Sequence, residues 1–308
     1  MDRFQAMRLF TRIVELGSFS AAAGQLGLTR AGATQGIQQL EVRLGVRLLA
    51  RTTRQVTPTA DGSDYYQRCV AILADLDEAE AAFSQAGRVP SGRLRIDLPG
   101  SLCRLVLMPA LPDFCRHYPG IRVELSVSDR QIDPLREGVD CVLRIGELDH
   151  DLPLVARRLA RLPLVSCASR RYLDRHGRPQ SLADLRGHRA VDNLSATTGK
   201  PFPFEFVVDG RIEQVSLPAS VAINDGGGFV AACAAGLGLI QVPLYHVTGQ
   251  LASGEFEEIL PGLRPPPMPL HLLHAPGRQP SARLRAFIDW VSGLFSQAGH
   301  RPPLHGPA

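Results

Sequence analysis

Apolar residues in the first part of the chain recur every three or four positions, which predicts a helix that ends near Gly17. The apolar positions of this helix are Phe4, Met7, Phe10, Ile13 and Val14. Ser18 and Thr29 then stand where N-cap residues would begin two further helices, the second running to about residue 44. Two short helices joined by a turn that contains glycine predict a helix-turn-helix.

The third predicted helix has one apolar and one polar face. Its apolar stripe, which is expected to pack inward, consists of Ala33, Ile37, Leu40 and Leu44. The leading half of the other face offers arginine, glutamine, hydroxyl and methyl groups, which are the groups that read base edges in the major groove of DNA. The candidate DNA-binding residues are Thr29, Arg30, Ala31, Thr34, Gln35 and Gln38. The alternative interpretation is an ordinary solvated helix face.

Two short apolar runs follow, at residues 46–50 and near residue 56, and they bracket a polar loop. This pattern predicts a β-hairpin wing that contacts phosphates or the minor groove. The candidate contact residues of the wing are Arg51, Thr52, Thr53 and Arg54. Residues 1–62 contain eight arginines and four acidic residues, in a chain whose net charge is +4. A basic excess in a small N-terminal unit favours a polyanionic partner, most simply nucleic acid.

Residues 60–88 are predicted to form one long helix, because Thr57 and Pro58 make a good helix start and no further proline appears before Pro90. Apolar residues in this helix are spaced four and three apart, which is typical of a heptad seam against a partner helix. The seam consists of Tyr65, Cys69, Ile72, Leu76, Ala79 and Phe83. We expect the same helix of a second subunit to fill it, so that two recognition helices read a palindromic site. Packing on the chain's own C-terminal domain is the alternative.

After a segment rich in glycine and proline at residues 87–92, strand-like and helical runs alternate. Alternation of this kind predicts α/β lobes with parallel sheets and crossover helices. Helical runs are expected at residues 102–117, 131–137, 227–235 and 281–295. The first lobe is expected to comprise residues 91–163 and 265–297, and the second lobe residues 164–264. Residues 298–308 include three prolines and two glycines and are expected to be disordered.

Four segments near the N-terminus together resemble the signature of LysR-type transcriptional regulators. They read ELGSFSAAA at 15–23, LGLT at 26–29, LEVRLGVRLLARTTR at 40–54 and TPTADG at 57–62. The resemblance implies an α+β multidomain protein with a winged helix-turn-helix at 1–59, a dimerising linker helix at 60–88 and a two-lobed effector domain of the periplasmic-binding-protein type 2 at 89–297. It further implies a homodimer or tetramer that binds an inverted repeat in double-stranded DNA, responds to a small-molecule effector and acts through RNA polymerase.

The same resemblance, together with the rule that ligands of open sheets collect at the carboxyl ends of strands, points to an effector site between the lobes. The candidate effector-binding residues are Ser101, Arg144, Ser169, Asn224 and Asp225. In the alternative interpretation, Ser101, Ser169 and Asp225 are helix caps and Arg144 forms a hinge salt bridge.

Motifs of catalysis and metal binding are absent from the sequence. There is no GxSxG, HExxH or Walker loop, no GxGxxG follows a strand, and the nine histidines lack metal-ligand spacing. We therefore expect no enzymatic activity, no metal and no cofactor. None of the six cysteines forms a CxxC pair, and neither a signal peptide nor a membrane span fits, which favours a cytoplasmic protein. Two other classes stay open: an architectural DNA-binding protein without an effector, and a solute-binding or enzymatic α/β protein with an accessory helical domain.

Overall fold

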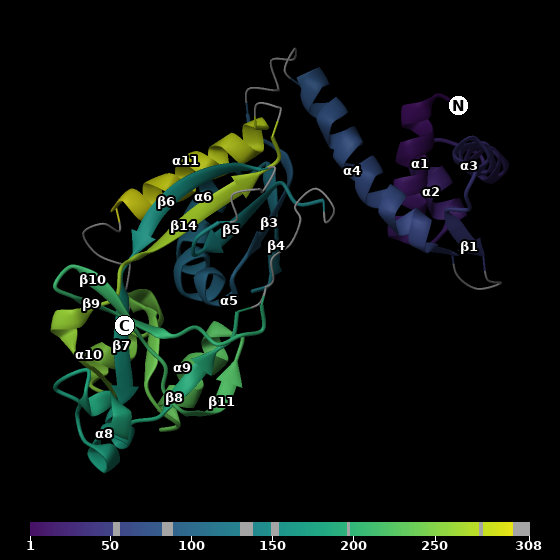
Figure 1. Cartoon of the computed structure of the whole chain (residues 1–308). Coiled ribbons are helices and arrows are strands. Elements are labelled where there is room, and N and C mark those ends of the chain that lie inside the picture. Colours follow the sequence, from purple (N-terminus) through teal and green to yellow (C-terminus); the bar gives the residue numbers. More distant parts are fainter. Residues whose placement is uncertain are drawn as a thin grey trace. The chain divides into compact units, whose positions relative to one another are not determined.

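A computed structural model describes the chain except for residues 52–55, 82–88, 130–137, 149–153, 196–197, 277–279 and 298–308. The chain divides into two compact units, one built on residues 1–89 and the other on residues 90–132 and 139–308 (Figure 1). The predicted helix at residues 131–137 and the predicted disordered tail at 298–308 lie outside the described residues.

Three helices open the first unit, and each begins at a capping side chain. They are α1 (Arg3–Leu16), α2 (Phe19–Gln25) and α3 (Arg30–Leu44). The hydroxyl of Ser18 accepts the N–H of Ala21 at 3.2 Å, and that of Thr29 accepts the N–H of Gly32 at 3.1 Å. Both predicted helix starts are therefore confirmed, because an N-cap satisfies a backbone donor that has no partner within the helix.

The core of this unit forms where the apolar stripes of the three helices meet. Leu9, Phe10 and Ile13 of α1 are fully buried, as are Ala33 and Ile37 of α3. The prediction was wrong at two helix ends, where Phe4 and Leu44 are 43% and 39% exposed. Phe4 lies in the first turn of α1 and Leu44 is the last residue of α3, so periodicity alone overstated their burial.

The predicted hairpin is confirmed as an antiparallel pair of β1 (Leu49–Arg51) and β2 (Val56–Pro58). One carboxylate oxygen of Glu41 in α3 accepts the N–H groups of Leu48 and Leu49, at 2.8 and 3.1 Å, and so ties the start of the hairpin to α3. Thr52, Thr53 and Arg54 lie outside the described residues.

The long helix α4 (Ala60–Ala81) begins at residue 60, but Thr57 and Pro58 do not form its first turn as predicted. Thr57 and Pro58 belong to β2 instead, where they pair with Ala50 and Leu49. Thr59 is the residue that caps α4: its hydroxyl oxygen accepts the N–H of Gly62 at 3.0 Å and its O–H donates to the carbonyl of Arg47 at 2.7 Å. The long-range strand pairing therefore moved the start that the local sequence favoured.

The first half of α4 packs on its own unit, which corrects part of the predicted seam. Cys69 is fully buried in the core of this unit, and the ring of Tyr65 lies 5.5 Å from that of Phe10. The expectation that Cys69 faces a partner helix was therefore wrong, because α1 already occupies that side of α4. Ile72 is 40% exposed, whereas Phe83 and the side chain of Ala79 lie outside what the structure describes.

The second unit contains a five-stranded sheet in the order β4-β3-β5-β14-β6. Its strands are β3 (Gly92–Leu98), β4 (Ile121–Val127), β5 (Cys141–Ile145), β6 (Val155–Leu162) and β14 (Met268–His274). The first three are parallel, whereas β14 is antiparallel to both of its neighbours, so the expectation of a parallel sheet holds only in part.

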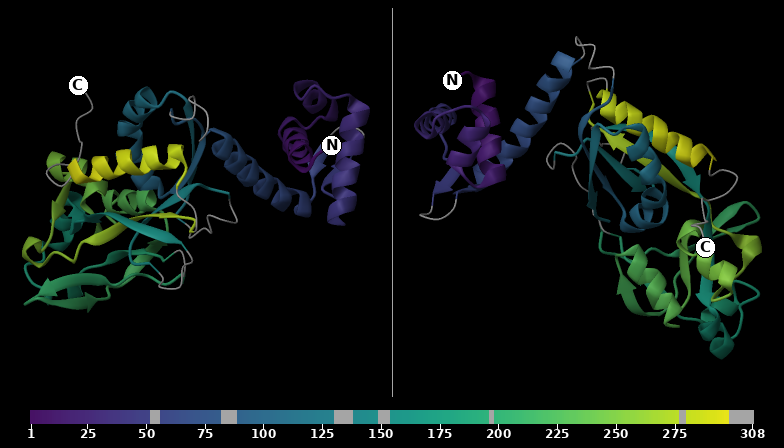
Figure 2. Two further views of the ribbon diagram at one scale, coloured as in Figure 1. Left: turned by 90° about the horizontal axis from the view of Figure 1, so that it is seen from above. Right: turned by 180° about the vertical axis from the view of Figure 1, so that it is seen from behind.

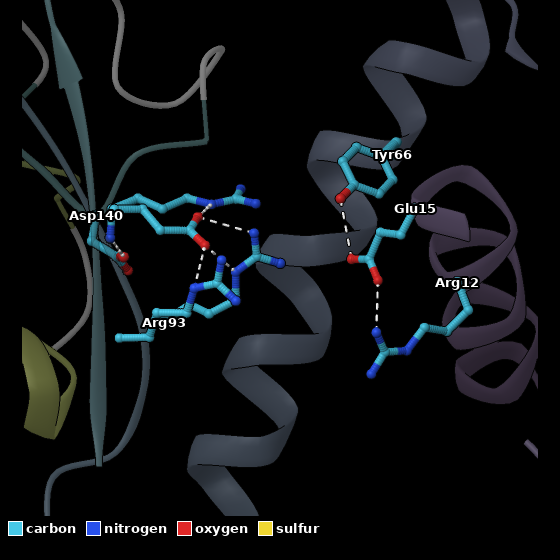
Figure 3. A network of polar contacts seen from close by, with 8 residues as sticks. Arg12, Glu15, Tyr66, Arg93 and Asp140 are labelled. Atoms are coloured by element: carbon cyan, nitrogen blue, oxygen red, sulfur yellow. Dashed lines mark hydrogen bonds and ion pairs between the residues drawn. The ribbon is translucent and has the colours of Figure 1, made fainter. Parts of the chain in front are cut away.

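Two helical segments form the core of this lobe with the sheet. The first runs without a break through α5 (Gly100–Leu102), a π-helical turn (Cys103–Leu107) and α6 (Met108–His117), and the second is α11 (Ala282–Gln297), which lies along the sheet (Figure 2). The ring of Phe114 lies 5.8 Å from that of Phe287 and 5.0 Å from that of Trp290. Across β3 and β4, Arg93 and Arg95 donate to Glu124 and lower its pKa, with Arg93 the stronger partner (Figure 3).

The second lobe is built on small sheets rather than one large sheet. At its centre β7 (Leu164–Ser169) pairs antiparallel with β12 (Ile240–Pro243) and with β13 (Phe256–Glu258). The parallel pair of β8 (Ala190–Asn193) and β11 (Ala219–Ile223) and the hairpin of β9 (Phe204–Val208) and β10 (Arg211–Val215) complete the strands described in this lobe. Its α-helices are α8 (Arg170–His176), α9 (Gly226–Ala234) and α10 (Thr248–Ser253).

Short 3-10 helices at Asp184–Gly187, Leu244–His246 and Pro261–Leu263 connect these elements. The strand-like runs of the sequence at residues 164–168, 204–208, 219–223 and 239–242 form β7, β9, β11 and β12, whereas β8, β10 and β13 were not predicted. The antiparallel direction of the central sheet was not predicted either. The apolar pattern of a buried strand is the same in both directions, so periodicity carries no information on this point.

Candidate DNA interface and effector cleft

Helix α3 presents the predicted polar face to solvent. Arg30, Ala31, Gln35 and Gln38 are exposed and Thr34 is half-buried, while the opposite stripe is buried against α1 and α2. Thr29 is exposed at the leading end, where its hydroxyl oxygen caps the helix. These side chains are therefore free to meet an external surface, as a helix that enters a DNA groove requires.

Gly36, on the buried face of α3, lies where a side chain would not fit. A Cβ at this position would lie 3.2 Å from Cδ2 of Leu9 and 2.7 Å from Cε of Met1. The missing side chain lets α3 pack closely on α1, so the helical propensity that glycine loses is offset by packing.

Not every arginine of this unit is available to a polyanion. Arg12 donates to Glu15 at 2.8 Å, and the hydroxyl of Tyr66 on α4 donates to the other carboxylate oxygen of Glu15 at 3.2 Å (Figure 3). This group ties α1 to α4 and balances the charge of Arg12 locally.

In the second unit, the lobes meet where the helical run of α5 and the helix α9 begin. The hydroxyl oxygens of Ser101 and Tyr245 are 3.1 Å apart, and Ser101 is buried. A Cβ on Gly226 would lie 2.9 Å from Cε1 of His246 and 3.4 Å from Oγ of Ser101. Residues from three separate segments of the chain therefore surround one small region between the lobes.

Asn224 and Asp225 flank the same region. Asp225 is the N-cap of α9 and accepts the N–H of Gly228 at 2.6 Å, whereas Asn224 is exposed. The guanidinium of Arg104 lies close by, since a Cβ on Gly227 would be 3.0 Å from its Nη2. Asp225 is therefore a helix cap, as the alternative interpretation of the sequence predicted. Ser101, for which the same alternative predicted a cap, contacts Tyr245 of the second lobe.

Arg144 forms an ion pair within the first lobe. Its Nη2 donates to Oδ1 of Asp97 at 2.6 Å, and its Nη1 donates to the carbonyl of Leu143 at 2.9 Å. The Asp97 side chain is almost entirely buried, and that of Arg144 is 12% exposed. Because Asp97 belongs to β3 and Arg144 to β5, the ion pair links these two strands at the edge of the cleft. Removing either partner would leave the other charge buried without compensation.

Ser169 does not join the other candidates. It precedes α8 and lines a hollow of about 520 Å³ together with Arg171, Arg175 and Ala234. Ala234 ends the nine-residue helix α9, whereas Asp225 precedes its first residue, so the helix separates the two sites by about 13 Å. The expectation that Ser169 shares one effector site with Ser101 and Asp225 was therefore wrong, because β7 carries it to the far end of α9.

Three titratable residues of the cleft were not predicted: Asp129, Tyr245 and His246. Desolvation, followed by the charge of Asp225, raises the pKa of the Asp129 carboxyl. Burial raises the pKa of Tyr245, and burial together with Arg104 lowers the pKa of His246 to about 4. Asp129 follows the end of β4 and the other two follow the end of β12, so the strand-end rule was the signal that could have found them.

The described residues form neither a metal-ligand cluster nor a membrane-spanning helix. No group of three or more His, Cys, Asp or Glu side chains there is placed to hold a metal ion. Nor does any helix in the same residues combine the length and the apolar character needed to cross a membrane. The six cysteines are free thiols; five are buried and Cys115 is exposed.

Two known protein families match successive parts of the chain. The family described as "Bacterial regulatory helix-turn-helix protein, lysR family" matches residues 4–63, and the "LysR substrate binding domain" matches residues 87–296. The regulator YhjC of Escherichia coli, itself named as uncharacterized, is 39% identical over 297 residues, with 96% of this chain and 99% of YhjC covered. A transcriptional repressor of Pseudomonas aeruginosa is 35% identical, with 96% and 93% covered.

A solved structure shows the same architecture over the full length. CrgA, a LysR-type transcriptional regulator from Neisseria meningitidis, matches with a TM-score of 0.60 and 30% sequence identity, covering 96% of this chain and 99% of CrgA. A winged helix-turn-helix joined by a helix to a two-lobed α/β domain with a cleft defines a ligand-responsive, DNA-binding transcriptional regulator. The chain belongs to the LysR family of these regulators.

Proposed function

We propose that two copies of this chain read an inverted repeat in double-stranded DNA, each with the exposed face of α3. The observation that carries this proposal is the difference in burial between the two faces of α3. The apolar stripe is buried, whereas Arg30, Gln35 and Gln38 are exposed. A glutamine can make two hydrogen bonds to adenine and an arginine can do the same to guanine. Thr34, Ala31 and Thr29 complete the proposed contact surface.

The wing completes the proposed DNA interface. Arg51 and Val56 pair across the hairpin, whose start is tied to α3 through Glu41, and Thr52, Thr53 and Arg54 follow Arg51 in the sequence. Phosphate or minor-groove contacts from these residues would add affinity without adding sequence information.

Subunits are proposed to associate through the part of α4 that lies beyond its contact with α1. Ile72 is exposed and Leu76 is partly exposed, whereas Cys69 belongs to the unit's own core. Ala79 and Phe83 continue the same heptad spacing along the sequence. A two-fold pair of such helices would set the distance between the two half-sites.

The effector is proposed to bind between the lobes, where Ser101, Asn224 and Asp225 lie near Tyr245 and His246. Two lobes that meet through few contacts can change their relative position when a ligand binds one arrangement better. That change would alter how the subunits present α3 to DNA and how the complex meets RNA polymerase. Related proteins include both a repressor and an activator, so the family alone leaves the direction of regulation open.

A gel-shift assay on the intergenic DNA beside the protein's own gene tests the DNA-binding proposal. Gln35→Ala should weaken binding to the specific fragment by about tenfold or more, because a lost bidentate base contact costs about 1–3 kcal/mol. Gln5→Ala is the matched control, since it removes an exposed glutamine from α1. If wild-type protein fails to shift the fragment at low salt, or if both variants bind equally well, α3 is not the reading element.

A further inference from the structure

A hollow of about 520 Å³ lies in the second lobe, where α8 follows β7 (Figure 1). It is bounded by α8, by the end of α9 and by the turn between α10 and β13. Its polar lining consists of Ser169, Arg170, Arg171, Asp174, Arg175 and Glu255. Pockets that hold small molecules commonly measure about 300–1,000 Å³, so the hollow has the size of a ligand site. It lies at the opposite end of α9 from Asp225 and is separate from the proposed effector cleft.

A buried hydroxyl without a partner belongs to this lining. Ser169 is 2% exposed, and its Oγ forms no hydrogen bond with the described residues. Although Ser169 directly precedes α8, its side chain does not cap that helix. A Cβ on Gly236 would lie 4.0 Å from this Oγ and 3.8 Å from Cδ of Arg171, so the hydroxyl and the arginine flank the same point. A buried hydroxyl that lacks a partner costs free energy, which an acceptor atom of a ligand would recover.

Two charged residues of the lining already have partners outside it. Arg170 donates to Glu257 at 3.2 Å, and Asp174 accepts from Arg178 at 2.9 Å. Arg178 also donates to Glu257 at 2.7 Å, so these four residues form one ion-pair network beside the hollow. Their charges are therefore largely balanced before any ligand binds.

Arg171 and Arg175 are the unpaired charges of the hollow. Both are exposed and lie one turn apart on α8, and within the described part of the chain their side chains form no hydrogen bond or ion pair. Like charges four residues apart on a helix repel each other. Three arginines and two carboxylates line the hollow, which gives it a formal charge of +1. A bound anion would offset the repulsion through charge-assisted hydrogen bonds from the two guanidinium groups.

We propose that this hollow binds the phosphate group of a small metabolite, which Arg171, Arg175 and the hydroxyl of Ser169 hold together. Two unpaired guanidinium groups match a phosphate, which carries about −1.5 to −2 charges at pH 7, better than a carboxylate, which carries one. The phosphate oxygens accept the O–H of Ser169, whereas guanidinium groups are donors only. The site would give the second lobe a ligand of its own, in addition to the effector of the cleft.

Hydrogen–deuterium exchange of the full-length protein tests this site, with inorganic phosphate as the probe at constant ionic strength. In wild type, phosphate should slow the exchange of peptides that contain residues 170–176, and the effect should saturate. Arg175→Gln should raise the half-maximal phosphate concentration about tenfold or more, because it removes charge-assisted hydrogen bonds. Ser169→Ala keeps every charge and should raise it about threefold. Arg186→Gln is the matched control, since it removes an exposed arginine of the same lobe that does not line the hollow.

Acetate distinguishes a phosphate ligand from a carboxylate ligand. At equal ionic strength its half-maximal concentration in wild type should be about tenfold higher or more, because it carries a single charge. Arg171→Gln should act like Arg175→Gln and serves if that variant fails to fold. The proposal is overturned if phosphate has no saturable effect on residues 170–176, if the arginine variants respond like wild type or like Arg186→Gln, or if acetate binds as well as phosphate. A phosphate response that Ser169→Ala leaves unchanged would reduce the site to a charged surface and would overturn it too.

Discussion

His246 shows how burial sets the charge of a single side chain in the cleft. It lies beside Gly226 at the start of α9, and desolvation, followed by the nearby Arg104, lowers its pKa to about 4 from the ordinary 6.5. The imidazole is therefore neutral at neutral pH. A neutral ring can donate one hydrogen bond and accept another, so it can orient an effector without adding a third positive charge to Arg104 and Arg144.

The free energy of unfolding should decrease as the pH is lowered, because His246 is held neutral in the folded protein. Below pH 6.5 the unfolded chain gains a proton on His246 while the folded protein does not, so the free energy of unfolding decreases until about pH 4. The loss between pH 7 and pH 5 is about 2 kcal/mol. Urea unfolding, followed by the fluorescence of the single Trp290, should show this loss in wild type and a clearly smaller one in His246→Leu.

The control for this prediction is His117→Leu, which removes an exposed histidine from α6 of the same unit. It should keep the wild-type decrease in stability. Equal pH dependence in His246→Leu and wild type would mean that His246 gains its proton in the folded protein as readily as in the unfolded chain.

At the scale of elements, the contact between the hairpin and α4 depends on a close approach of two backbones. A Cβ on Gly62, in the first turn of α4, would lie 1.9 Å from the carbonyl oxygen of Leu48. Thr59 adds two hydrogen bonds at the same junction, one to Gly62 and one to Arg47. The position of the wing relative to α4 therefore depends on a residue that has no side chain.

Gly62→Ala should destabilise the first unit by about 2 kcal/mol or more, because a methyl group against backbone forces α4 and the hairpin apart. Melting of the full chain, followed by circular dichroism, measures the effect. Gly24→Ala is the control with the opposite sign: no atom lies within 4 Å of its Cβ position in α2, and alanine there should stabilise by about 0.5–1 kcal/mol. Equal melting temperatures of the two variants would contradict the proposed junction.

At the scale of the whole molecule, the proposed function requires two subunits. A single α3 reads one half-site, so an inverted repeat is recognised only when a second copy is held at a defined distance. Within the described part of α4, the half that packs on α1 is already covered, which leaves the region around Ile72 for the partner.

Ile72→Glu should weaken self-association by at least about tenfold, because a charge would be buried without a partner in the helix pair. Sedimentation velocity at several concentrations measures this change, and affinity for the inverted repeat should fall with it. Val42→Glu is the matched control: Val42 is 83% exposed at the end of α3, and its substitution should leave self-association intact. An Ile72→Glu protein that sediments like wild type would place the subunit interface elsewhere.

The features that could be predicted were those whose causes lie within a few residues. The caps at Ser18 and Thr29 follow from side chains that bond to backbone three residues away, and the apolar stripe from Ala33 to Leu40 follows from helical periodicity. The resemblance at residues 15–62 identified the family for the same reason, since its motifs are contiguous in sequence.

By itself, the sequence determined the helices of the first unit, those near residues 102–117, 227–235 and 281–295, most of the strands and the kind of regulator this chain is, because these depend on local periodicity, capping and contiguous motifs. The short helices α8 and α10 were not predicted. Only the tertiary structure decided that Thr57 and Pro58 pair in a hairpin and that Cys69 belongs to its own subunit's core. The cleft is also a product of the tertiary structure, since Ser101 meets Tyr245 there across 144 residues of chain. Contacts over such separations depend on how whole elements pack, and no spacing in the sequence encodes them.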